Sequence, residues 1–354
     1  MATAMTATAT PVPTVASHAQ DTTLPPPPKG DITTPVLFAQ NFQQPSTGYM
    51  FIKNPPPAGV PYTNIRGEPA MVTVEDLRGK EDSVNLDHDS LQVLQGLTDV
   101  PRSPDVNWDS IQSVEKTFYP AVEATIKSSI PGAHTVHIFR HGIRHSQNWP
   151  VPYNPPAMIA HLDQTGPAAI NRVLRHMGPV EGPRLLQGRY RIVHFWTPLN
   201  GPVYTCPVAV ASSATVKDED IQIFVSHLGG VGGLDMPLGR PVAKPDASEQ
   251  YREDFGAPRY SDGQRWFYLS GITQDEALLI QIFDSKALQK DSTVQGAEPC
   301  IRPSAIPGLH REPPIVGVLR FPAWFSAMSD SVGYKLIIFV FCVLGLDLGC
   351  SLCV

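Results

Sequence analysis

The chain has 354 residues, of which 42% are hydrophobic, and this is enough to bury a substantial core in one large domain or in two. A formal net charge of −6 without a long basic run argues against nucleic acid or an anionic membrane as the main partner. Thirty-seven prolines disfavour an all-helical protein. Five cysteines, three of them near the C-terminal end, do not make a disulfide framework, so we expect a reducing compartment, the cytoplasm.

Residues 1–35 form a segment rich in Ala, Thr and Pro, with four consecutive prolines at 25–28. Such a composition has too little apolar side chain to offset the entropy of ordering, and it predicts disorder. The segment has neither the apolar stretch of a secretory signal nor the arginines of a transit peptide. We expect a single folded domain to follow over residues 36–320.

The first half of this domain combines short strands with one helix. Residues 49–64 contain four prolines and predict an irregular loop, whereas 71–74 predict a short strand. Apolar residues recur every three or four positions over 108–126, which predicts an amphipathic helix that Pro120 kinks or splits.

Residues 135–139 are apolar and β-branched and predict a strand, and a cluster of basic side chains follows at once. Arg140, His141, Arg144 and His145 could lie beside an anionic cosubstrate or a metal. A solvated loop of mixed polar residues explains the same cluster equally well.

The stretch 160–177, AHLDQTGPAAINRVLRHM, contains the pair His161 and Asp163. In an extended segment, residues two apart leave the same face, so one imidazole and one carboxylate would converge on one point. Two histidines and one carboxylate form the facial triad that holds non-haem Fe(II), and this pair would supply two of the three. The alternative is an exposed polar turn in which Asp163 caps a helix over 167–177.

Three further buried strands are predicted over 191–196, 266–269 and 277–283. Because no strand-helix alternation is visible, the pattern favours a mainly β core with appended helices, in a barrel or a sandwich.

Several segments in the right order resemble the AsaB-like hydroxylase/desaturase family of fungal secondary metabolism, which includes a gibberellin desaturase and CmcJ-like proteins. They are the stretch 160–177, HFWTPLNGPVYTCPVAV and QRWFYLSGITQDEALLIQIFDS, supported upstream by PPPAGVPYTN, VTVEDLRGKED and TVHIFRHGIR. The resemblance implies a double-stranded β-helix, or jelly-roll, core and Fe(II)/2-oxoglutarate-dependent oxygenase chemistry. It also implies a small natural-product substrate and a homodimer or heterodimer with a related subunit.

The resemblance also implies roles for particular residues. His161 and Asp163 match the first two iron ligands, and Arg311 matches the arginine that pairs with the far carboxylate of 2-oxoglutarate. Trp196 matches a W-x-P signature, in which Thr197 stands where the family usually carries Arg.

The distal histidine of the family is missing from the segment 292–303. Counting back from Arg311 reaches Ala297, which cannot bind a metal. Glu298 is then the substitute ligand if the register slips by one, and His310 is a further candidate. Two hypotheses follow: an active oxygenase with a substitute ligand, or a catalytically degenerate accessory subunit of an intact relative.

The C-terminal segment 321–354 extends past the resemblance, and residues 336–354 are almost wholly apolar, with Asp347 as the one charge. This length is close to the ~20 residues of a membrane-spanning helix, so a C-terminal anchor is one interpretation. The other is that a retained intron or a shifted reading frame produced the tail.

Overall fold

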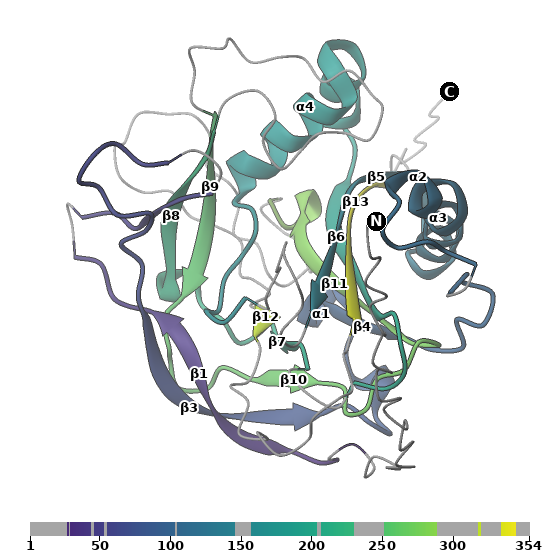
Figure 1. Ribbon diagram of the computed structural model, residues 1–354, viewed down its shortest axis with the longest axis horizontal. Helices are drawn as coiled ribbons and strands as arrows, with labels where there is room; N and C mark the ends of the chain where they lie inside the picture. The colour runs from purple at the N-terminus through teal and green to yellow at the C-terminus, as the bar shows by residue number, and fades with distance from the viewer. Residues whose placement is uncertain are drawn as a thin grey trace, which may run out of the picture.

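The computed structural model describes residues 27, 29–43, 46–52, 55–102, 105–145, 157–203, 207–229, 251–288, 318–319 and 334–344. Within these ranges the protein is mainly β, with three sheets and a few helices at their margins (Figure 1). The mainly β fold with appended helices is confirmed.

The strands, in chain order, are β1 (Ile32–Ala39), β2 (Tyr49–Phe51), β3 (Gly67–Asp76), β4 (Leu91–Leu94), β5 (Ala133–His145), β6 (Tyr190–Pro198), β7 (Ala209–Ala211), β8 (Ile221–Gly229), β9 (Tyr251–Pro258), β10 (Trp266–Tyr268), β11 (Ala277–Asp284), β12 (Val318–Leu319) and β13 (Tyr334–Leu344). The α-helices are α1 (Leu86–Asp89), α2 (Ile111–Ser113), α3 (Tyr119–Ser129) and α4 (Gly166–Leu185), and one π-helical turn, Val114–Phe118, joins α2 to α3.

Two five-stranded sheets and one three-stranded sheet make up the fold. Their strand orders are β1-β3-β10-β7-β12, β4-β11-β6-β13-β5 and β2-β8-β9. In Figure 1, α4 lies between the β8–β9 hairpin and the end of β6, and α2 and α3 lie outside β5 and β13. Neighbours in the second sheet are far apart in sequence, so the core depends on long-range pairing.

The middle of the second sheet is the most buried part of the protein. Every residue of β6 and of β11 is buried, as expected for strands that are covered on both faces. On one face pack Val114, Phe118, Val122 and Ile126, which are fully buried at the predicted helical spacing. Pro120 lies in the first turn of α3, where the absence of its N–H is tolerated.

The structure extends or corrects several sequence-based expectations. The strands expected at 191–196, 266–269 and 277–283 are β6, β10 and β11. The strand expected at 71–74 belongs to the longer β3, and the proline-rich segment 49–64 includes β2. The basic cluster after 135–139 was expected in a loop as one alternative, but it lies within β5, which continues to His145.

The predicted C-terminal tail contributes a strand to the second sheet. β13 pairs antiparallel with β5 on one side and with β6 on the other, over nearly its full length. Among the described residues, no helix is both long enough and apolar enough to cross a membrane.

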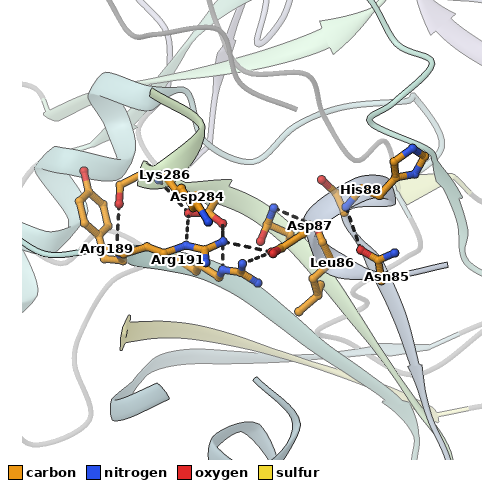
Figure 2. Close-up of polar contacts among 12 residues, drawn as sticks. Asn85, Leu86, Asp87, His88, Arg189, Arg191, Asp284 and Lys286 are labelled. Atoms are coloured by element: carbon orange, nitrogen blue, oxygen red, sulfur yellow. Dashed lines mark hydrogen bonds and ion pairs between the residues drawn. The ribbon is translucent and has the colours of Figure 1, made fainter. Parts of the chain in front are cut away.

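A charged network ties α1 to the ends of β6 and β11 (Figure 2). Arg189 donates from Nε to Asp284 Oδ1 at 3.1 Å and from Nη2 to Asp87 Oδ1 at 3.0 Å. Arg191 places Nε 2.9 Å from Asp284 Oδ2 and also contacts Asp87. We call these four side chains the Asp284 network. Two positive and two negative charges neutralise one another there, and the buried carboxylate of Asp284 stands between the two arginines.

Candidate active site

The segment that carries His161 and Asp163 is extended and held between two strands. Ala160 N–H donates to the carbonyl of Leu37 in β1 at 2.8 Å, and Leu162 N–H donates to the carbonyl of Gly256 in β9 at 2.7 Å. A Cβ added at Gly256 would lie 3.1 Å from the side chain of Leu162, so the small residue permits this close approach. The segment is thereby fixed from both sides.

α4 follows this segment, and its N-cap residue is not Asp163, as the alternative interpretation of the sequence predicted. The Thr165 hydroxyl, not Asp163, accepts from Ala168 N–H and caps the helix. Asp163 does not take the cap, and its carboxylate lies beside His161 instead. The helix expected over 167–177 is the first part of α4, which kinks at Gly178, where φ is 79°.

His161 and Asp163 converge as the two-residue spacing predicts. His161 Nε2 lies 3.6 Å from Asp163 Oδ1, and the two side chains are 23% and 27% exposed. His161 Nδ1 lies 2.8 Å from the backbone carbonyl of Ile159, which only accepts, so Nδ1 carries the proton. In the neutral ring Nε2 then carries the lone pair, which is the arrangement that prepares a histidine to bind a metal.

His194 is the site residue that sequence reasoning missed. It lies in the middle of β6, 2% exposed, with Nε2 3.1 Å from Asp163 Oδ2. Burial raises the pKa of Asp163, but the hydrogen bond from His194 and the charges of His194, His161 and Arg140 outweigh it and leave the pKa well below its usual range. Asp163 is therefore ionised. A histidine inside an otherwise apolar strand, RIVHFWTP, was the available signal.

A cavity of about 500 Å³ opens beside the pair. His161, Asp163, Arg140 and Arg144 give it a polar side. An apolar side comes from β2, β8, β9 and the loop before β3, with Met50, Ile52, Ile65, Phe224 and Phe255. Such a cavity has the size and the mixed lining of a small-molecule site.

A buried ion pair braces one wall of this cavity. Arg172 of α4 donates from Nε to Glu253 Oε1 of β9 at 2.5 Å, and its Nη2 contacts the other carboxylate oxygen. The guanidinium also lies 5.6 Å from the ring centre of Phe139 in β5. Arg172 thus links α4, β9 and β5 around the site.

The donors near the cavity fit part of a metal site. His161 and Asp163 offer a lone pair and an ionised carboxylate, the ligand types of the facial triad. In the part of the chain that the structure describes, no group of three His, Cys, Asp or Glu side chains encloses a metal position. His194 Nε2 lies 3.1 Å from the carboxylate of Asp163. The other predicted site residues, Glu298 and Arg311, and the candidate His310, lie outside the described residues.

The chain matches a family described as an oxidoreductase/YMDC permease-like domain over residues 36–298. This match covers most of the chain, so the chain belongs to this family, whose description names an oxidoreductase.

The relatives define the family more narrowly. The hydroxylase/desaturase poxK of Penicillium oxalicum is 94% identical over 292 residues, which cover 82% of this chain and 90% of that protein. The Fe(II)/2-oxoglutarate-dependent dioxygenase nvfI of Aspergillus novofumigatus is 26% identical over 255 residues, 70% of this chain and 83% of its own. A solved structure of the iron and alpha-ketoglutarate-dependent endoperoxidase NvfI matches with a TM-score of 0.67 and 21% identity, over 90% of this chain and 100% of that one.

The chain therefore belongs to the hydroxylase/desaturase family of fungal secondary metabolism, which also includes asaB of Aspergillus flavus. It is an oxygenase-type oxidoreductase, and the resemblance seen in the sequence is confirmed.

Proposed function

We propose that this protein is an Fe(II)- and 2-oxoglutarate-dependent hydroxylase or desaturase that acts on a small natural product in the 500 Å³ cavity. One observation carries the proposal: His161 and Asp163 present a lone pair and an ionised carboxylate side by side at the cavity wall. The name of the relative nvfI, which includes both cofactors, supports it. The likeness to NvfI also supports a jelly-roll core for the sheets.

His161 and Asp163 would hold the iron. When bound, Fe(II) and 2-oxoglutarate would activate O2, which is the oxidant, and would so supply the chemistry that removes hydrogen from an unactivated C–H bond. His161 contributes a fixed tautomer, because the carbonyl of Ile159 holds the proton on Nδ1. His194 orients the carboxylate of Asp163 and keeps it ionised. The apolar side of the cavity, with Phe224 and Phe255, binds the substrate and excludes water.

Several finer predictions remain part of this proposal. Glu298 is the substitute third ligand, and Arg311 pairs with the far carboxylate of 2-oxoglutarate. We place the catalytic domain over the predicted residues 36–320 together with the start of β1 at Ile32 and with β13 (Tyr334–Leu344), so the disordered segment predicted over 1–35 and the separate tail predicted over 321–354 are both drawn too wide. A cytoplasmic location and a dimer with a related subunit are predictions of the same kind, whereas the alternative of a C-terminal anchor conflicts with the pairing of β13 in the second sheet.

The test is an anaerobic titration of the purified full chain with Fe(II), followed by measurement of succinate released from 2-oxoglutarate. We expect one Fe(II) per chain, and loss of most of this binding in His161→Ala. His134→Ala is the matched control, since His134 is an exposed histidine of β5 whose ring contacts the Thr135 hydroxyl. If wild-type protein retains no iron and releases no succinate, the degenerate accessory subunit becomes the correct function.

A further inference from the structure

Gln164 is a buried polar side chain of the cavity that the proposed iron site does not use. It follows Asp163 directly in the chain, lines the same cavity and is 3% exposed. Among the described residues, nothing donates a hydrogen bond to its Oε1 atom. Burial removes the hydrogen bonds that water gives a carboxamide in the unfolded chain, so an unpaired one destabilises the fold. A group that binds in the cavity would supply the missing partner.

Two other glutamines show how a carboxamide is used when its role is structural. Oε1 of Gln264 and Oε1 of Gln281 also lack a partner among the described residues, but each carboxamide is anchored through Nε2. Gln264 Nε2 donates to the carbonyl of Arg259 at 2.9 Å. Gln281 Nε2 donates to the carbonyl of Leu86 at 3.2 Å. Gln164 has no such anchor within the described part of the chain, and it lines the cavity.

The backbone on both sides of Gln164 is held by β9. Leu162 N–H donates to the carbonyl of Gly256 at 2.7 Å, and Thr165 N–H donates to a carbonyl of the same strand, that of Asp254, at 3.4 Å. The Thr165 hydroxyl also caps α4. A side chain between two fixed points is preorganised, so less freedom is lost when it binds a ligand.

The neutral polar side chains of the cavity lining are Thr63, Gln164 and Ser226. The backbone already occupies the hydroxyl of Thr63, which donates to the carbonyl of Tyr49 at 2.8 Å and accepts from Ile65 N–H at 3.1 Å. Ser226 offers a hydroxyl, which can rotate toward a donor or an acceptor. A carboxamide instead presents one acceptor and one donor at a fixed separation. Gln164 is therefore the more selective group for an uncharged ligand.

The chemistry of Gln164 determines which ligand it fits. Its Oε1 needs a donor, and its Nε2 needs an acceptor. Carboxylates and phosphates only accept at neutral pH, so 2-oxoglutarate would leave Oε1 unpaired. An amide or a lactam carries an N–H beside a C=O and matches both atoms of the carboxamide with two parallel hydrogen bonds. The ligand of Gln164 is thus the substrate and not the cosubstrate.

We propose that Gln164 is a specificity-determining residue that binds an amide or lactam group of the natural-product substrate. This inference rests on the proposed function and adds the substrate class, an apolar molecule that carries an uncharged amide. The apolar part packs against Phe224 and Phe255, whose ring centres lie 5.5 Å apart in an edge-on arrangement.

The test is isothermal titration calorimetry of the full-length protein with two matched probes, γ-octalactam and γ-octalactone. The probes share ring size and side chain, and they differ only in that an oxygen of the lactone replaces the N–H of the lactam. Wild-type protein should bind the lactam about tenfold more tightly or better, because the lactone leaves Oε1 unpaired. Gln164→Met has a side chain of similar size without the carboxamide, and it should bind both probes equally.

Gln281→Met is the matched control, because it removes a buried carboxamide of β11 that does not line the cavity. This variant should keep the preference for the lactam. Melting temperatures separate the two roles further. Gln281→Met loses its hydrogen bond to Leu86 and should melt at a lower temperature than wild type. Gln164→Met loses only an unpaired polar group and should melt at the same temperature or higher.

The proposal is overturned if wild-type protein binds the two probes equally or binds neither, or if Gln164→Met keeps the preference for the lactam. A lower melting temperature of Gln164→Met together with loss of both probes would make Gln164 a structural residue and would overturn it too. These titrations need neither iron nor 2-oxoglutarate. A failure of the proposed iron site would therefore appear in the Fe(II) titration and not in this one.

Discussion

Two clusters of charged side chains in this protein use the same residue types for opposite purposes. In the Asp284 network, Arg189 and Arg191 share the carboxylates of Asp87 and Asp284 (Figure 2). In the cavity, Asp163 faces two histidines and two arginines. The first cluster closes on itself, whereas the second lines a cavity. Charged side chains that pair with one another hold elements together, and titratable side chains that line a cavity mark a candidate site for a ligand.

The largest effect is expected from Asp284→Asn. Asp284 is 2% exposed and lies against two arginines, so its loss leaves Arg189 and Arg191 with only the half-exposed Asp87 as counter-charge. The free energy of unfolding, measured by urea denaturation, should fall by about 3–5 kcal/mol. Asp87→Asn is the control: its side chain is 50% exposed, and the loss should stay below about 1 kcal/mol. Equal losses in the two variants would contradict the structural role given to Asp284.

His161→Ala is expected to weaken iron binding strongly while it changes the stability of the fold little. Its side chain is partly exposed and makes one hydrogen bond, to the carbonyl of Ile159, so the free energy of unfolding should change by less than about 1 kcal/mol. Affinity for Fe(II) should fall by more than about 100-fold, because a ligand is removed. Parallel denaturation and Fe(II) titration would separate the two effects. A large stability loss with iron binding retained would place His161 among the structural residues.

A smaller effect on iron is expected at His194. The variant His194→Ala removes the hydrogen bond to Asp163 and should weaken Fe(II) binding about 10- to 100-fold. The variant His194→Asn keeps an N–H donor and should recover most of this affinity. If the two variants lose affinity equally, His194 is itself a ligand and not the residue that positions Asp163.

The smallest effect concerns the pH dependence of stability at Asp87. Burial raises the pKa of Asp87, but the charges of Arg191 and Arg189 and their hydrogen bonds lower it below its ordinary value of 3.8. A lowered folded-state pKa contributes stability that is present above 3.8 and is lost as pH falls through the lowered value. Between about pH 6 and pH 3, Asp87→Asn should therefore lose less stability than wild type does. Urea denaturation at both pH values measures the difference.

Much of the fold follows from local pattern. The strands β6 and β11 are rich in apolar and β-branched residues, and the buried face of α3 shows regular helical spacing, so both could be predicted from residue types alone. The convergence of His161 and Asp163 follows from their spacing of two. β5 was predicted too short, because a run of Arg and His resembles a loop when the partner strand β13 is not considered.

The rest of the site depends on contacts that no local pattern encodes. His194 of β6 contacts Asp163, which lies 31 positions earlier in the chain, because the fold brings β6 next to the extended segment that carries Asp163. Thr165 rather than Asp163 caps α4, because the extended segment turns the carboxylate of Asp163 toward His194. Residue propensities predict whether a residue lies in a helix or a strand, but they do not predict which side chain of another element that residue will contact.

The sequence alone determined that this is a β-rich oxidoreductase with a histidine and an aspartate two residues apart. The tertiary structure decided that His194 joins this pair and that Arg140 and Arg144 face the same cavity. The physical reason is that spacing along an extended chain fixes the direction of neighbouring side chains, whereas contacts between distant strands depend on sheet pairing, on the bulge in β5 and on the packing of the whole core.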